Sequence, residues 1–289
     1  MSDPAVPVAR ALWHLLEPIH AVTYFAPESG AAATDVGFRG FWMGYFGFRA
    51  APLGPVGPGV VSAVFSNFAR PMVERSLPDA WVCAPVPAAL EARSTSAATA
   101  LRRLSPGVED AAAAVLPALR AVIEGAPGAG RPLFAANRDL PGSPDPVGAL
   151  WQAATTLREH RGDGHVACLT AAGIDGCQAH VLFAACEEVP AEVLRGNRGW
   201  TEGEWAAAET ELAARGLMHG GAPTERGRAI RAELEAQTDT LAGSAFTDLS
   251  AEALTELRSA LAYVTSAVLA SGVIPFPNPM GPPATRPAP

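Results

Sequence analysis

The stretch TEGEWAAAETELAARGLMHGGAPTERGRAI, residues 201–230, decides the predicted fold. Thr201 and Glu204 have the spacing of a capping box, which begins a helix, and Gly216 supplies a C-terminal stop to that helix. Two adjacent glycines then predict a very short β-hairpin within residues 217–222. A helix, a small hairpin and the start of another helix therefore follow one another in this one stretch.

Helices are also predicted on both sides of these elements. Asp175 can cap a helix to about Glu187, and Pro190 begins a short helix before the capping box. After the hairpin, Pro223 precedes a long helix to about Leu241. Helix, short helix, helix, hairpin and helix is the order of a winged helix-turn-helix.

Short sequence pairs recur at a nearly constant offset in the two parts of the chain. The pair LW at residues 12–13 recurs at residues 150–151, and GF at 37–38 has a counterpart, GC, at 176–177. These anchors lie 138 or 139 residues apart. We therefore predict a mainly α fold of tandem, pseudo-duplicated winged-helix-like domains with very short β-hairpin wings.

The predicted division of the chain follows from this duplication and from a Gly/Pro-rich stretch between its copies. It comprises a first winged-helix-like half (1–105), a helix and Gly/Pro-rich connection (106–148), a second winged helix (149–247), a C-terminal helix (248–274) and a disordered Pro-rich tail (275–289).

Apolar residues in the predicted C-terminal helix repeat at heptad-like spacing, at Leu254, Leu257, Leu261, Val264 and Val268. Two interpretations stay open: the repeat packs against the chain's own core, or it forms the seam of a homodimer. The second would suit a structural protein that docks another chain.

The composition is that of a globular protein, with 49% hydrophobic and 17% charged residues. The net charge is −8. The chain contains no lysine, so arginine and lysine together are represented by arginine alone. Such a negative field repels nucleic acid and acidic membranes, so DNA binding would require a local basic patch.

The sequence points to a cytoplasmic protein that does not bind membranes. No signal peptide and no long uninterrupted apolar stretch is visible. The four cysteines form no CxxC pair, so zinc-ligand spacing is absent, and we expect buried, reduced thiols.

Two sets of residues carry a family resemblance. Residues 211–217 (ELAARGL) followed by 223–230 (PTERGRAI) resemble the end of a MarR-type winged helix. Further stretches are similar to the SalK-type helix-turn-helix family of actinobacteria, at residues 12–20, 24–28, 40–46, 51–54, 157–165 and 198–200. The resemblance implies the fold, and its MarR-like part implies a ligand-responsive transcriptional regulator, but the family's name describes no activity.

The helix that would read DNA carries the wrong charge for that task. Residues 202–215 contain four glutamates and one basic residue, Arg215, and the hairpin has no arginine. Each phosphate contact needs a cation, so we predict that DNA is an unlikely partner. Arginines that flank this helix could still hold a DNA backbone: Arg195, Arg198, Arg226, Arg228 and Arg231. In the first half, the equivalent helix at residues 59–70 is apolar and is expected to be core.

Polar residues gather on the predicted N-terminal helix and just after it, at His14, Glu17, His20, Tyr24 and Glu28. Glu17 and His20 share a helix face if the helix continues through Pro18. Three interpretations stay open for that pair: a buried Glu–His hydrogen bond between helices, a ligand contact, and a metal site of the Glu-x-x-His type.

A second charged cluster occupies residues 158–165 (REHRGDGH). Its two glycines predict a tight loop in which the side chains converge. His160, Asp163 and His165 could then act as general acids or bases, and Arg161 could hold an anionic group. The alternative is an ion-pair network that locks the two halves together.

These clusters lead to the functional hypothesis of a small-molecule pocket between the halves. Its candidate catalytic residues are His160, Asp163, His165, Glu17 and His20, and its candidate ligand-binding residues are Tyr24, Glu28, Arg39, Trp42, Tyr45, Arg49 and Arg161. Both an enzyme of specialised metabolism and a noncatalytic binder fit this pattern. No nucleophile motif, phosphate loop or dinucleotide fingerprint is present, so the sequence indicates neither a reaction nor a cofactor.

Overall fold

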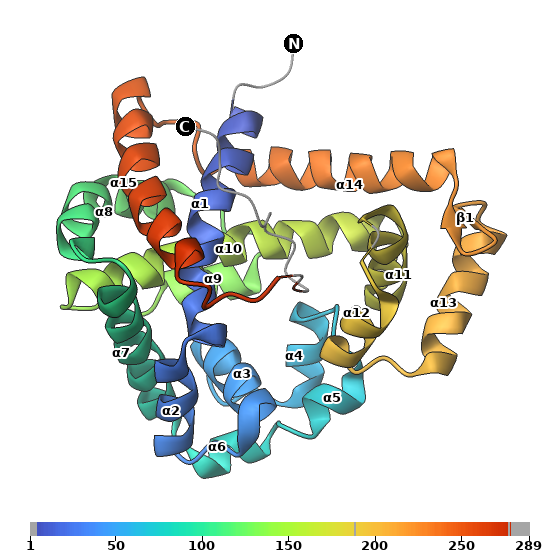
Figure 1. Ribbon diagram of the computed structural model, residues 1–289, viewed down its shortest axis with the longest axis horizontal. Coiled ribbons are helices and arrows are strands. Elements are labelled where there is room, and N and C mark those ends of the chain that lie inside the picture. The colour runs from blue at the N-terminus through green and yellow to red at the C-terminus, as the bar shows by residue number, and fades with distance from the viewer. Residues whose placement is uncertain (1–4, 188, 277, 279–289) are drawn as a thin grey trace.

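The computed structural model describes residues 5–187, 189–276 and 278, and these residues are mainly α-helical (Figure 1). The first part of the chain forms α1 (Ala5–Phe25), α2 (Pro27–Asp35), α3 (Gly40–Ala50), the 3-10 helix η1 (Ala51–Leu53), α4 (Pro58–Val64), α5 (Arg70–Glu74), α6 (Asp79–Cys83), α7 (Val86–Leu104), α8 (Val108–Gly125), α9 (Pro132–Arg138) and α10 (Pro146–Ala171). The remainder forms α11 (Gly176–Glu187), α12 (Ala191–Arg198), α13 (Glu202–Ala214), β1 (Met218–His219), β2 (Ala222–Pro223), α14 (Glu225–Gly243) and α15 (Ala251–Ala270).

The predicted winged helix is confirmed from α11 to α14. The Thr201 hydroxyl accepts a hydrogen bond from the backbone N–H of Glu204, whose carboxylate accepts one from the backbone N–H of Thr201. Gly216 follows α13 with a φ of 70°, a conformation that favours glycine. In the antiparallel hairpin Met218 pairs with Pro223, and β1 and β2 are the only strands among the described residues.

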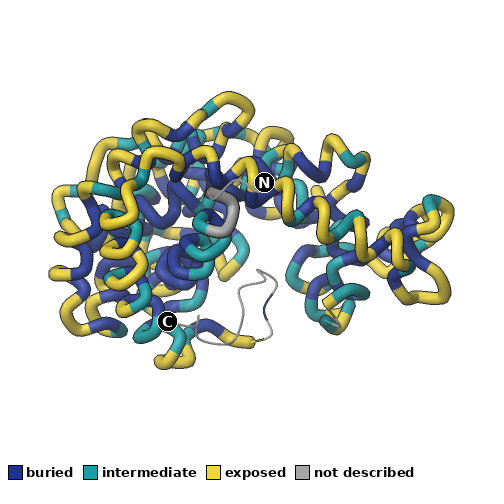
Figure 2. Tube along the Cα trace, turned by 90° about the horizontal axis from the view of Figure 1, so that it is seen from above, coloured by how far each residue is buried: buried dark blue, intermediate teal, exposed yellow. Residues whose placement is uncertain are grey.

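The largest hydrophobic core surrounds α10, which contacts α1, α7, α8, α9 and α14. Its buried side chains include Leu12 and Ile19 from α1 and Trp151 from α10. A second core joins the aromatic side chains of α3 to α4–α7, and a third lies within the winged helix. Figure 2 shows the winged helix as a smaller lobe beside the main body. In Figure 1, α10 leads toward this lobe and α14 leads from the hairpin back to the main body. The division into tandem halves stays a prediction.

The structure corrects two local predictions. The helix expected over residues 59–70 ends at Val64, and α5 begins only at Arg70. The loop expected around Gly162 and Gly164 is wrong, because α10 runs through both glycines without a break. Gly164 instead permits a close approach: a Cβ there would lie 2.8 Å from the Arg131 guanidinium.

The heptad-like repeat of α15 faces the protein's own interior. Leu257, Leu261, Val264 and Val268 are each at most 1% exposed in the main core, and Leu254 packs against its edge. The intramolecular interpretation therefore accounts for the repeat. Most of the predicted tail, residues 275–289, lies outside the described residues.

Across the described ranges, no single helix has the length and apolar character needed to cross a membrane.

Candidate functional site

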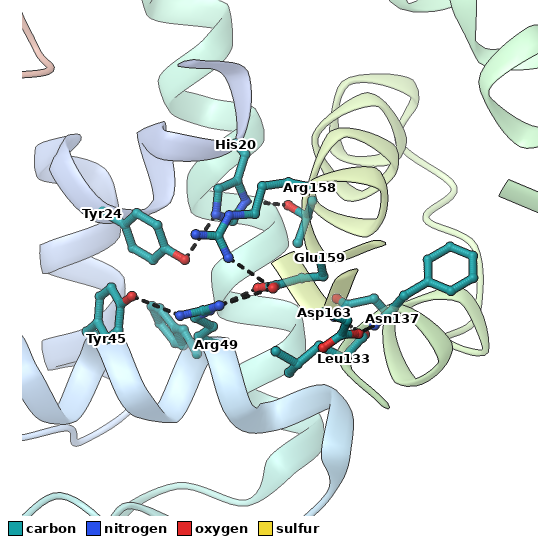
Figure 3. Close-up of polar contacts among 12 residues, drawn as sticks. His20, Tyr24, Tyr45, Arg49, Leu133, Asn137, Arg158, Glu159 and Asp163 are labelled. Atoms are coloured by element: carbon teal, nitrogen blue, oxygen red, sulfur yellow. Dashed lines mark hydrogen bonds and ion pairs between the residues drawn. The ribbon is translucent and has the colours of Figure 1, made fainter. Parts of the chain in front are cut away.

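Three helices bring polar side chains together beside the main core (Figure 3). The side chains come from α1 (Glu17, His20, Tyr24), α3 (Tyr45, Arg49) and α10 (Arg158, Glu159), and we call these seven residues the polar cluster. Spacings of three and four residues place the members from α1 on one face and those from α3 on another, whereas Arg158 and Glu159 are adjacent in α10. Pro18 lies within α1, and the helix continues through it.

Arg49 and Glu159 form the centre of the polar cluster. The Arg49 guanidinium donates two hydrogen bonds to the Glu159 carboxylate, from Nε to Oε1 at 2.9 Å and from Nη2 to Oε2 at 3.1 Å. Arg158 donates to the same carboxylate at 2.9 Å, and its Nε lies 3.5 Å from Glu17. The side chain of Arg49 is 9% exposed and that of Glu159 1%. Two parallel hydrogen bonds fix the orientation of the Arg49 guanidinium relative to the Glu159 carboxylate, and little solvent reaches the pair.

Electrostatics keep this buried pair ionised. Burial by itself would raise the pKa of Glu159, but Arg49 and Arg158 outweigh it and hold that pKa below its ordinary value. Burial would lower the pKa of Arg49, and the Glu159 charge reverses that shift, so the pKa is raised. Both groups therefore carry their charges at neutral pH.

His20 links the polar cluster to two hydroxyl groups. Its Nδ1 lies 2.9 Å from Thr155 Oγ1 and its Nε2 lies 3.0 Å from the Tyr24 hydroxyl. Burial, aided by Arg158, lowers the pKa of His20 well below its usual value, and burial raises the pKa of Tyr24. A neutral imidazole between two hydroxyls can accept a proton or pass one along. Glu17 instead accepts from Trp13 at 3.0 Å, so the expected Glu17–His20 hydrogen bond is wrong.

A small cavity of about 10 Å³ lies against the polar cluster, with room for roughly one water-sized group. Its lining includes residues that the sequence analysis missed, namely Thr23, Arg93, Asn137, Trp151 and Thr155. Arg93 gave no distinct signal, because α7 also contains the charged residues Glu91, Arg102 and Arg103. The others are ordinary helix residues that only the packing brings here. A larger open groove of about 860 Å³ between α8 and α15 contains no candidate residue.

Partly exposed aromatic side chains border the polar cluster. Tyr45 packs against Tyr24 with ring centres 4.7 Å apart, and Trp42 lies 5.7 Å from Tyr45. Trp13, Trp42 and Tyr45 are all intermediate in exposure. Trp42 and Tyr45 were predicted as ligand contacts, and the structure places Tyr45 within the polar cluster and Trp42 beside it.

Because α10 is continuous, the other charged residues of 158–165 point in different directions. His160 packs edge-on against Phe134 at 4.8 Å, and burial with nearby Arg131 lowers its pKa to about 3. Asp163 accepts a hydrogen bond from the backbone N–H of Phe134 at 2.9 Å, and burial raises its pKa to about 6 (Figure 3). The expected convergence of His160, Asp163 and His165 is therefore wrong.

The remaining predicted residues make contacts away from the polar cluster. Arg161 forms an ion pair with Asp239 of α14, and His165 Nδ1 lies 3.0 Å from Thr238 Oγ1. These contacts favour the ion-pair alternative for this part of α10. Two more residues are paired at the surface, Glu28 with Arg103 and Arg39 with Asp79.

Among the described residues, no group of three or more histidine, cysteine, aspartate or glutamate side chains has the arrangement of a metal site. The Glu17 and His20 side chains are instead occupied by the hydrogen bonds described above.

A helix-turn-helix family model matches residues 9–275, nearly the whole chain. The chain belongs to this helix-turn-helix family. No curated protein and no solved structure shows significant similarity to this chain. The match supports the winged-helix arrangement from α11 to α14 and carries no statement about activity.

The recognition helix of this helix-turn-helix protein, α13, presents an acidic and small-residue surface. Its four glutamates are hydrogen-bonded locally, Glu202 to Arg195, Glu204 to Thr201, Glu209 to Trp205 and Glu211 to Gln178. The guanidinium of Arg215 donates to the backbone carbonyls of Ala172 and Gly173 at the end of α10. Arg215, the single basic residue of residues 202–215, is therefore hydrogen-bonded to the C-terminal end of α10.

Four of the five flanking arginines have intramolecular contacts, and the fifth, Arg228, is exposed. Arg195 pairs with Glu202, Arg226 donates to the Arg215 carbonyl, and Arg231 pairs with Glu187 and Glu235. Arg198 is 5% exposed, and its guanidinium lies over the Phe68 ring at 4.6 Å. Acidic side chains are the partners of Arg195 and Arg231 in these contacts.

Proposed function

We propose that this helix-turn-helix protein binds a small molecule at the polar cluster and that its winged helix serves as a scaffold instead of a DNA reader. The observation that most directly supports this proposal is the buried Arg49–Glu159 ion pair. Arg158 also binds Glu159, and partly exposed aromatic rings border the pair. Buried charges cost desolvation free energy, and convergent polar groups beside apolar walls are typical of ligand sites.

The proposal includes acid–base chemistry at His20. A neutral imidazole in contact with the Tyr24 and Thr155 hydroxyls could relay a proton between them and a bound molecule, which suits an enzyme of specialised metabolism. The SalK-type, MarR-like subtype belongs to the same proposal and is supported by residues 211–217 and 223–230. A cytoplasmic location is supported by the four free cysteines.

Ligand binding is tested by native mass spectrometry of the purified protein, followed by denaturing extraction and identification of released molecules. We expect an adduct on the unaltered protein and at least a tenfold lower occupancy in Arg49→Met. Tyr24→Phe keeps the ring packing and removes one hydroxyl, so it reports on the site if Arg49→Met folds poorly. Arg39→Met is the matched control, because Arg39 is exposed and distant from the polar cluster. No adduct on any variant, and no release on extraction, would contradict the proposal.

DNA reading is tested by fluorescence anisotropy against the chromosomal region upstream of the protein's own gene, at low and moderate salt. We expect weak binding that does not distinguish this sequence from a scrambled duplex. Sequence-selective binding with a steep salt dependence would instead support a MarR-like regulator, because counterion release accompanies phosphate contacts.

A further inference from the structure

Arg93 is a buried cation whose partners are neutral. It is 3% exposed. It donates from Nη1 to the Phe48 carbonyl at 3.0 Å, and from Nη2 to Asn137 Oδ1 at 3.0 Å and Gln152 Oε1 at 2.9 Å. The Trp151 ring lies 5.2 Å from its guanidinium and offers a π face but no charge. Within the described part of the chain, Arg93 forms no ion pair with a carboxylate.

The charges around the small cavity do not balance. Arg49 and Arg93 line it together with one carboxylate, Glu159. Counted over the polar cluster and Arg93, three arginines stand against two glutamates, an excess of one positive charge. His20 and Tyr24 are neutral for the reasons given above. Asp163 is absent from the lining and is bound to a backbone N–H of α9.

Thr23, a residue that lines the same cavity, has a hydroxyl that makes no hydrogen bond within the described residues. The Oγ1 atom of this hydroxyl is buried. A buried hydroxyl without a partner costs free energy, so its position calls for an acceptor that the chain does not supply. The Thr23 hydroxyl that lacks a partner and the excess positive charge therefore belong to the surroundings of the same small cavity.

We infer that this cavity binds a monovalent anion, either a halide ion or the carboxylate of a small organic acid, through Arg93 and the Thr23 hydroxyl. The volume of about 10 Å³ limits the occupant to one small group. One negative charge would neutralise the buried excess, and a carboxylate or halide accepts the hydrogen bonds that Arg93 and Thr23 can donate. The carboxylate case rests on the proposed function, because the occupant is then the acidic group of the proposed ligand.

The test is the melting temperature of the whole protein in a chloride-free methanesulfonate buffer, which contains neither a halide nor a carboxylate. Chloride or formate replaces methanesulfonate at constant ionic strength. We expect a saturable rise of about 5 °C at a hundredfold excess over Kd. A response to formate alone assigns the site to carboxylates, and a response to both anions assigns it to monovalent anions in general. No response to either anion overturns the inference.

Variants locate the effect in the cavity. Arg93→Met should abolish the response, and Thr23→Val should fold normally and require at least tenfold more anion. Ser105→Ala is the matched control, because Ser105 Oγ is another buried hydroxyl without a partner among the described residues and lies outside the cavity. An unchanged response in Thr23→Val overturns the inference even if Arg93→Met does not fold.

The outcomes separate this inference from the proposed function. An anion response that Thr23→Val weakens, without any co-purifying organic molecule, supports the anion site while the proposed ligand function fails. A neutral or cationic ligand that co-purifies, with no response to small anions, leaves the proposed function standing and removes the inference.

Discussion

At the scale of single residues, the polar cluster depends on one carboxylate that binds two arginines. Glu159 neutralises Arg49 and Arg158 in a region with little solvent. Removing one member of such a group leaves an uncompensated buried charge, whereas removing two opposite charges together does not. A comparison of single and double variants can therefore measure how strongly these charges interact.

We expect Glu159→Gln to lower the free energy of unfolding by about 3–5 kcal/mol, because it leaves Arg49 and Arg158 buried without their shared carboxylate. Arg49→Met should lower it by less, because Glu159 keeps its contact with Arg158. The double variant should lose clearly less than the sum of the two single losses. Urea unfolding of the three variants measures the coupling. Strictly additive losses would show that the two side chains do not interact as described.

At the scale of elements, the winged helix is fixed to the rest of the protein by backbone contacts at the start of α11 and the end of α12. The Ala69 amide, just before α5, donates to the Arg198 carbonyl at 2.8 Å. Gly176, the first residue of α11, lies so close to the segment after α4 that a Cβ would meet the Ser66 carbonyl oxygen at 1.8 Å. A backbone atom cannot move aside as a flexible side chain does.

Two glycine-to-alanine substitutions in neighbouring helices should therefore have opposite effects. Gly176→Ala should cost about 1–3 kcal/mol, because the added methyl group forces α11 away from the Ser66 carbonyl. Gly196→Ala in α12 meets open space and should gain about 0.5–1 kcal/mol from reduced unfolded-state entropy. Urea unfolding checks both. Equal effects would mean that α11 does not pack against this segment.

At the scale of the whole molecule, buried histidines make stability depend on pH. Burial, with smaller contributions from Arg131 and Arg198 respectively, lowers the pKa values of His160 and His180 to about 3. In the unfolded chain each takes up a proton near pH 6.5. Their contribution to stability is therefore complete above pH 6.5 and is lost as the pH falls toward 3.

We expect the free energy of unfolding to fall between pH 7.5 and pH 5, by about 1–2 kcal/mol for each of these two histidines. Asp163 acts in the opposite direction, because its raised pKa of about 6 favours the folded state as the pH falls from 6 toward 3.8. Asp163→Asn should consequently make the acid loss steeper, and His160→Phe should make it shallower. Urea unfolding at the two pH values measures these slopes. Identical slopes in all three proteins would contradict the burial of these groups.

The sequence by itself determined the elements whose signals are local. The capping box at Thr201, the stop at Gly216 and the paired glycines of the hairpin each fix the backbone within a few residues. The winged helix therefore followed from the sequence, as did the acidic character of α13. His20, Tyr24, Tyr45 and Arg49 were also recognisable, because polar side chains at helical spacing stand out in an apolar chain.

Only the tertiary structure decided which of these side chains meet. The continuation of α10 through Gly162 and Gly164 distributed the charges of residues 158–165 over different neighbours, and the sequence could not show it because the reason for Gly164 is an arginine from another element. Arg93 joined the site through the packing of α7 against α10. Helix periodicity assigns a side chain to a face, but the neighbour of that face depends on contacts between segments far apart in the chain.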